Sequence, residues 1–119
     1  MKLGITGTRK FTDYKIFRHR VDRLKPTELI SGGAKGADAL AERYASDYDI
    51  PITVILPKFK IDPETTYHPR WYLERNKDIV NQSDVVLAFW DQHSRGTNHT
   101  IKYARSCGTP VIIISTDHP

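Results

Sequence analysis

The sequence contains a single cysteine, Cys107, among its 119 residues, and it lacks any long hydrophobic run. One cysteine cannot form a disulfide within the chain, and no pair of cysteines stands at zinc-binding spacing. No apolar stretch approaches the roughly 20 residues that a membrane-spanning helix needs. The first residues, MKLGITGTRKF, lack the apolar core of a secretory signal. We therefore expect a globular cytoplasmic protein without a membrane partner, in which Cys107 is buried on a helix and inert.

Two common nucleotide-binding motifs and a metal-binding pattern are also missing. The stretch after the first expected strand reads Gly4-Ile5-Thr6-Gly7-Thr8-Arg9, which is not the GxGxxG of a dinucleotide-binding fold. No GxxxxGK string followed by Ser or Thr is present either, so an ordinary NAD dehydrogenase and a P-loop NTPase are disfavoured. His68, His93 and His99 are not at metal-ligand spacing. We expect no metal site and no resident cofactor.

Positive charge is concentrated at the start of the chain. The net charge is +4, and residues 1–25 carry eight Lys and Arg against two acidic residues. This excess could be the electrostatic footprint of nucleic acid or another polyanion. It could equally be the solvated face of a helix. Composition leaves both interpretations open.

Strand-like and helix-like segments alternate along the chain, and several of them end at a Gly or a Pro. This alternation predicts a single Rossmann-like domain over residues 1–119, with a five-stranded parallel sheet in a doubly wound, three-layer α/β/α fold. Ligands of such sheets bind at the carboxyl ends of the strands. We expect strands at 3–6, 28–31, 52–56, 84–90 and 111–115, helices at 13–25, 37–50, 70–82 and 97–107, and a long loop at 57–69.

Three polar turns follow strand ends in this prediction, and the fold places all three at one edge of the sheet. Glycines let the backbone approach a ligand closely, and the N–H groups that open a helix favour an anion. Lys35 and Arg9 would add positive charge, while Asp38 could accept ribose hydroxyls or cap its helix. Each turn could instead be a tight connection without a ligand, but together they predict a nucleotide-type or phosphosugar ligand. The residues concerned are Gly7, Thr8 and Arg9, then Gly32, Gly33, Lys35, Gly36 and Asp38, and finally Ser94, Gly96 and Thr97, of which Thr97 could also cap the last helix.

An ordered set of motifs runs from residue 3 to residue 115: the turn GTR, the turn SGGAKGAD, the pair Arg75-Asn76, the strand SDVVLAFW and the turn SRGT. This set resembles the SLOG superfamily of Rossmann-like proteins, specifically its YspA-like branch. More distant relatives are the LOG-type phosphoribohydrolases, the DNA-processing protein DprA and the nucleoside deoxyribosyltransferases. The resemblance implies a nucleotide-derived ligand, such as a nucleoside phosphate, NAD or ADP-ribose, contacted by Arg75 and Asn76. Relatives of this type commonly form dimers, so it also implies a homo-oligomer.

The resemblance departs from the enzymes at one position. In the phosphoribohydrolases and deoxyribosyltransferases, a glutamate three residues after a Gly-Thr turn carries the glycosidic chemistry, and this spacing falls on Thr100 here. A hydroxyl without an activating base cannot readily replace that carboxylate. Asp91 is the best substitute by position, with Arg75 as the anion contact, whereas Asp38 and Glu74 remain alternatives.

Three functions are compatible with these observations. The first is a nucleotide-binding or sensing module, which Thr100 favours, and in which Trp90 could stack on a base or simply belong to the core. The second is an N-glycoside hydrolase or transferase acting on nucleoside monophosphates or NAD-like substrates. The third is nucleic-acid binding, as in the DprA relatives, through the basic helix that carries Arg18, Arg20 and Arg23.

Overall fold

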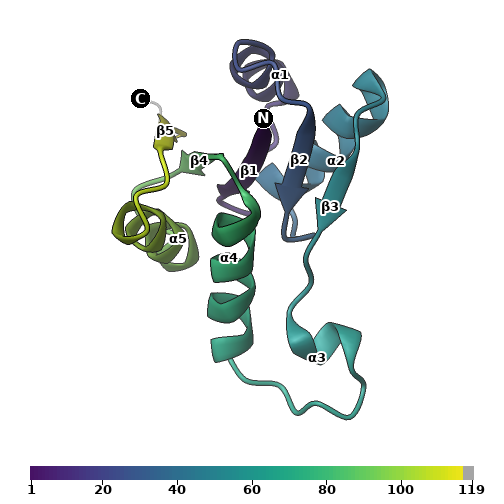
Figure 1. Ribbon diagram of the computed structural model, residues 1–119, viewed down its shortest axis with the longest axis vertical. Coiled ribbons are helices and arrows are strands. Elements are labelled where there is room, and N and C mark those ends of the chain that lie inside the picture. The colour runs from purple at the N-terminus through teal and green to yellow at the C-terminus, as the bar shows by residue number, and fades with distance from the viewer. Residues whose placement is uncertain (117–119) are drawn as a thin grey trace.

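The centre of the molecule is a five-stranded parallel sheet (Figure 1). A computed structural model of the chain describes residues 1–116, and its strands pair in the order β3-β2-β1-β4-β5. Parallel neighbours cannot be joined by a tight turn, so helices connect the strands across the faces of the sheet. The strands are β1 Lys2–Gly7, β2 Glu28–Ser31, β3 Ile52–Val54, β4 Val85–Trp90 and β5 Val111–Ser115; the helices are α1 Tyr14–Asp22, α2 Ala37–Tyr48, α3 Lys58–Ile61, α4 Arg70–Gln82 and α5 Arg95–Ser106.

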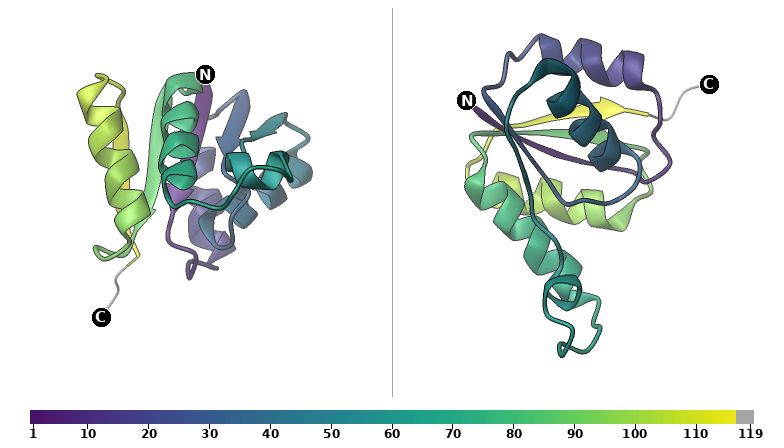
Figure 2. Two further views of the ribbon diagram at one scale, coloured as in Figure 1. Left: turned by 90° about the horizontal axis from the view of Figure 1, so that it is seen from below. Right: turned by 90° about the vertical axis from the view of Figure 1, so that its right-hand side faces the viewer.

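Helices cover both faces of the sheet. Helices α1 and α2 lie on one face, and α4 and α5 lie on the other (Figure 2, right panel). The larger core lies under α1 and α2, where the rings of Phe17 and Phe89 stack with their centroids 5.1 Å apart. Val80, Val86 and Ala104 form a smaller cluster on the opposite face. The predicted doubly wound α/β fold is confirmed, and no helix within residues 1–116 is long and apolar enough to cross a membrane.

Helix α5 begins earlier than the sequence suggested. It starts at Arg95 rather than at Thr97, and Ser94 is its N-cap residue. The carboxylate of Asp91 accepts hydrogen bonds from the backbone N–H groups of His93, at 2.9 Å, and Ser94, at 2.7 Å. These bonds turn the chain into the helix two residues ahead of the predicted start. Thr97, which we expected to cap the helix, is buried in its first turn.

The segment predicted to be a long loop contains one helical turn. Residues Lys58–Ile61 form α3, and the ring of Phe59 packs edge-on against Tyr72 of α4 with centroids 5.5 Å apart. The preceding strand is also shorter than predicted. Strand β3 ends at Val54 because its pairing partner, β2, ends at Ser31.

Cys107 is exposed, which corrects the expectation that it is buried. The expectation came from the general tendency of free cysteines to be buried. The helix ends at Ser106, however, so Cys107 is its C-cap and leaves the covered face of the sheet.

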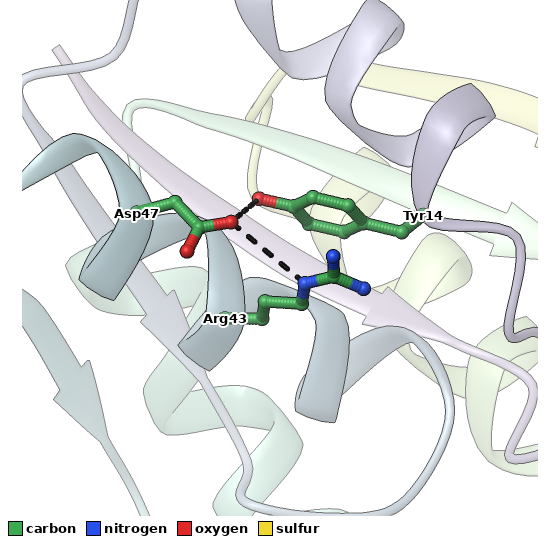
Figure 3. A network of polar contacts seen from close by, with 3 residues as sticks. All are labelled: Tyr14, Arg43 and Asp47. Atoms are coloured by element: carbon green, nitrogen blue, oxygen red, sulfur yellow. Dashed lines mark hydrogen bonds and ion pairs between the residues drawn. The ribbon is translucent and has the colours of Figure 1, made fainter.

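A polar contact joins α1 to α2 on the surface (Figure 3). The hydroxyl of Tyr14 donates to the Asp47 carboxylate at 2.7 Å, and Arg43 lies 3.7 Å from the same oxygen. The Arg43 guanidinium also lies over the Tyr14 ring, 3.8 Å from its centroid. Partial burial, together with the hydrogen bond and the negative charge of Asp47, raises the pKa of Tyr14 to about 12.

Replacing Tyr14 with phenylalanine is expected to lower the free energy of unfolding by about 1 kcal/mol at neutral pH, because the hydrogen bond to Asp47 is lost. The pKa of Tyr14 is raised in the folded state, so its contribution is present below about pH 10 and is lost between pH 10 and 12. The difference between wild type and Tyr14→Phe should therefore shrink over that range in urea unfolding. Tyr48→Phe, which removes another hydroxyl from the same surface, serves as the control. A difference that stays constant up to pH 12 would contradict the assigned contact.

Candidate functional site

A cavity of about 510 Å³ opens at the carboxyl edge of the sheet. Residues from all three polar turns contribute to it, together with one face of α4. The turns that follow β1, β2 and β4 therefore meet at one place, as their positions at strand ends require. The residues that line the cavity are Ile5, Thr6, Gly7, Thr8, Arg9, Lys10, Ala34, Asp38, Tyr72, Arg75, Asn76, Ile79, Asp91, His93, Ser94, Gly96 and Thr97.

Most of the residues that the sequence marked as a site border this cavity, and a smaller group does not. The residues that border it are Gly7, Thr8, Arg9, Asp38, Arg75, Asn76, Asp91, Ser94, Gly96 and Thr97. Gly32, Gly33, Lys35, Gly36 and Trp90 lie outside its lining, four of them in the glycine-rich turn after β2.

The glycine-rich turn packs closely against the turn after β1, and one of its amides is bonded within the chain. The N–H of Ala34 donates to the Asp38 carboxylate at 3.1 Å, so an internal anion already occupies part of this turn. Gly36 has a φ of +71°, and a Cβ there would lie 2.3 Å from the backbone oxygen of Thr8. Lys35 is exposed. Gly36 thus allows the turns after β1 and β2 to pack closely. That these glycines also approach a ligand stays a prediction.

Two guanidinium groups lie close to one aromatic ring in the cavity wall. Arg75 is buried, and it donates to the side chain of Asn76 at 2.9 Å and to the backbone oxygen of Gly32. The centroid of the Tyr72 ring lies 5.6 Å from the Arg75 guanidinium carbon and 5.7 Å from that of Arg9. Burial lowers the pKa of Arg75, but a guanidinium remains charged at neutral pH. With Lys10, which also lines the cavity and is exposed, the cavity therefore holds one fixed, buried cation and two exposed ones.

The pKa values of the two carboxylates in the cavity, Asp38 and Asp91, are shifted in opposite directions. Burial raises the pKa of Asp38, although the N–H of Ala34 and the charge of Arg75 oppose the shift. For Asp91, burial alone would raise the pKa, but hydrogen bonds from Ser94 and His93 outweigh it and lower the pKa to about 2. A carboxylate with such a low pKa is a weak proton acceptor at neutral pH. Asp91 thus has a clear structural role in the turn before α5.

The side chains of Thr100 and Trp90 donate hydrogen bonds to backbone oxygens of the chain itself. Thr100 is fully buried, lies outside the cavity lining, and donates its hydroxyl hydrogen to the backbone oxygen of Gly96 at 3.0 Å. The indole N–H of Trp90 donates to the backbone oxygen of Ser94 at 3.2 Å. The position where the related enzymes carry their glutamate is therefore closed to a ligand in this cavity.

The sequence interpretation missed several lining residues, notably Tyr72 and His93. Tyr72 could have been found, because it stands three residues before Arg75 on a helix and so shares its face. Within residues 1–116, no group of three or more His, Cys, Asp and Glu side chains is arranged to hold a metal ion.

Comparisons with known proteins agree with this architecture. The family model described as YspA, cpYpsA-related SLOG family matches residues 1–60. The Gene 61 protein of Mycobacterium phage D29 is 30% identical over 114 residues, which cover 91% of each chain.

Two solved structures of DNA processing protein A (DprA) share the fold. The protein from Streptococcus pneumoniae matches with a TM-score of 0.81 and 17% identity, over 94% of this chain and 49% of that one. The protein from Helicobacter pylori, whose structure concerns its single-stranded DNA binding mode, matches with a TM-score of 0.72 and 20% identity, over 95% of this chain and 64% of that one. The chain thus spans about half to two thirds of the length of these proteins.

Proposed function

We propose that the chain, which belongs to the YspA, cpYpsA-related SLOG family, is a binding module for single-stranded nucleic acid, which it holds by phosphate at the carboxyl edge of its sheet. The single-stranded DNA binding mode reported for the similarly folded Helicobacter pylori protein supports this class of ligand. The identities to the solved structures show the fold alone, so the argument for the ligand depends on the site.

Gly96 is the observation that carries the proposal. It stands in the first turn of α5 and lines the cavity, and a Cβ added there would meet nothing within 4 Å. It is not among the glycines with positive φ, which are Gly33, Gly36 and Gly108. Glycine weakens a helix by up to about 1 kcal/mol relative to alanine, and the protein's own packing offers no reason for it. A ligand that approaches the opening N–H groups of α5 closely supplies that reason.

The charges around this space suit a phosphate. Arg9 and Lys10 are exposed at the cavity, and Arg75 presents a buried guanidinium. The first-turn N–H groups of α5 have no acceptors within their own helix, and the helix dipole adds positive potential there. Backbone phosphate is bound by such combinations of Arg, Lys and helix N-terminus without dependence on base sequence.

Catalysis on a glycosidic bond is not part of the proposal. Thr100 is buried at the position where the related enzymes carry a glutamate, and the low pKa of Asp91 disfavours a role in proton transfer. When AMP, NAD or ADP-ribose is offered, neither the wild-type protein nor Asp91→Asn is expected to release the base.

A free nucleotide is the second candidate ligand, and the cavity volume favours it. About 510 Å³ lies within the range of roughly 300–1,000 Å³ that is usual for small-molecule sites. A nucleoside phosphate, NAD or ADP-ribose could place its phosphate beside Arg75 and its ribose hydroxyls near Asp38.

Fluorescence anisotropy with a labelled thymidine oligonucleotide separates the two candidates. The proposal expects saturable binding of the single strand, weaker binding of a duplex of the same length, and an affinity that falls steeply with salt because phosphate contacts release counterions. Saturable binding of a nucleotide, followed as a rise in melting temperature, without any binding of the oligonucleotide would instead select the second candidate. If the protein binds neither the oligonucleotide nor the nucleotide, both candidate functions are wrong.

Replacing Gly96 with alanine is expected to weaken oligonucleotide binding about tenfold while leaving the melting temperature unchanged or higher, because the new methyl group stabilises the helix and occupies the ligand's space. Gly96→Val should weaken binding further. Both variants are to be measured by anisotropy and by thermal unfolding. Unchanged affinity in both variants would mean that no ligand approaches this turn.

A further inference from the structure

An arm protrudes from the body of the protein beside the cavity. It comprises residues 57–71, that is α3, the connection that follows it and the start of α4, and it extends beyond the sheet in Figures 1 and 2. Helix α3 buries none of its residues, and Ile61 and Tyr67 are 67% and 58% exposed. These apolar side chains contribute little to the core, so their exposure calls for another explanation.

Three aromatic rings meet at the base of the arm. Tyr67 contacts Phe59 edge-on at 5.1 Å and Tyr72 at 6.3 Å, and Phe59 contacts Tyr72 at 5.5 Å. Mutual edge-to-face contacts hold the rings in defined orientations. Tyr67 is thus a fixed aromatic side chain that remains mostly accessible to a ligand.

Cations accompany the rings along the arm. The ammonium of Lys58 and the guanidinium of Arg70 lie 5.0 Å and 4.5 Å from the centroid of the Trp71 ring. The acidic residues of the arm lie at its turn, where the Asp62 carboxylate accepts hydrogen bonds from the N–H of Glu64 and the hydroxyl of Thr65.

Tyr72 joins the arm to the cavity. Its ring contacts Phe59 and Tyr67 on the arm, and the same ring lies beside the guanidinium groups of Arg9 and Arg75 in the cavity. A continuous surface therefore runs from cations that suit a phosphate to an exposed aromatic ring. Alternating phosphate and base along a single strand has the matching chemistry, since any base can stack on an aromatic ring whatever its identity.

We propose that the arm is a base-stacking platform, on which Tyr67 receives a base of the single strand whose phosphate lies in the cavity. This inference rests on the proposed function and extends it from the phosphate to the base. A duplex keeps its bases paired and stacked inside, so the platform selects single strands without reading their sequence.

The test compares a thymidine oligonucleotide with an abasic oligonucleotide of the same length, so that bases and phosphates are assessed separately. The wild-type protein should bind the thymidine strand about tenfold more tightly than the abasic strand. Tyr67→Ala should remove most of that preference by weakening binding of the thymidine strand alone, whereas Tyr67→Phe should retain it. Tyr48→Ala, which removes an exposed tyrosine from α2, is the matched control and should leave both affinities unchanged.

Each other outcome overturns the platform in a recognisable way. If Tyr67→Ala keeps the preference for bases while the phosphate-dependent binding persists, the platform is wrong and the proposed function stands. If Tyr67→Ala weakens binding of the thymidine and abasic strands equally, Tyr67 only stabilises the structure of the arm and does not stack on a base. A wild-type protein that binds neither strand contradicts both proposals. A dimer that dissociates on Tyr67→Ala, without any oligonucleotide binding, would assign the arm to contact with a second copy of the chain.

Discussion

Gly36→Ala is expected to destabilise the fold by on the order of 3 kcal/mol, the largest loss among the single substitutions considered for this protein. Gly36 has a φ of +71°, which L-residues rarely adopt. A Cβ added there would lie only 2.3–2.7 Å from backbone atoms of Thr8 and Arg9. Those neighbours are backbone atoms of the turn after β1, so they cannot rotate away as a side chain would. Either the helix α2 or the β1 turn must move. Urea unfolding measures the loss.

Gly108→Ala is the matched control for this substitution. Gly108 also has a positive φ, +73°, but a Cβ there would meet nothing within 4 Å. Its replacement should cost about 1 kcal/mol, the penalty of the backbone conformation alone. Equal losses at the two positions would show that close packing between the turns after β1 and β2 does not stabilise the protein.

The double substitution Arg9→Glu and Lys10→Glu is expected to weaken binding of a single-stranded oligonucleotide about 100-fold at low salt. Both side chains are exposed at the cavity, so their reversal removes two contacts to phosphate and replaces them with repulsion, at roughly 1.5 kcal/mol each. The dependence of affinity on salt should also become shallower, because fewer counterions are released. Both quantities come from anisotropy titrations at several salt concentrations.

Arg20→Glu combined with Arg23→Glu makes the same change in net charge at a different surface. These arginines border a groove on the α1 side of the sheet, which is also lined by Leu24 and by residues of β4 and β5, and they do not line the cavity. Binding should stay within about threefold of wild type, since only long-range potential changes. If this control weakens binding as much as the cavity variant, the basic N-terminal helix is the nucleic-acid surface and the proposed site is wrong.

Much of the candidate site could be predicted because it depends on strand ends. Thr8 directly follows β1, while Asp38 and Gly96 lie in the first turns of the helices that follow β2 and β4, and parallel strands place their carboxyl ends at one edge. Arg75 was found through the resemblance to a family. Its hydrogen bond to Gly32 was not, since it joins positions 43 residues apart and depends on how α4 packs on the sheet.

For the glycine-rich turn, the sequence pattern predicted that a backbone approaches closely but did not identify the partner. Glycines between a strand and a helix predict close approach of a backbone, and Gly36 does allow one. The sequence cannot say what approaches, and here it is the chain's own turn after β1. In the same way, the Asp38 carboxylate accepts a hydrogen bond from the Ala34 N–H, a group that the motif predicted to face a ligand.

The alternation of apolar strands with amphipathic helices by itself determined the doubly wound fold and the edge at which its polar turns gather, because these follow from local periodicity and the handedness of crossovers. Only the tertiary structure decided which groups face the cavity and which satisfy one another. It also decided that Phe59, Tyr67 and Tyr72 form one aromatic cluster beside two arginines. Those arrangements depend on contacts between distant segments, whose energies are set by packing and burial rather than by any local pattern.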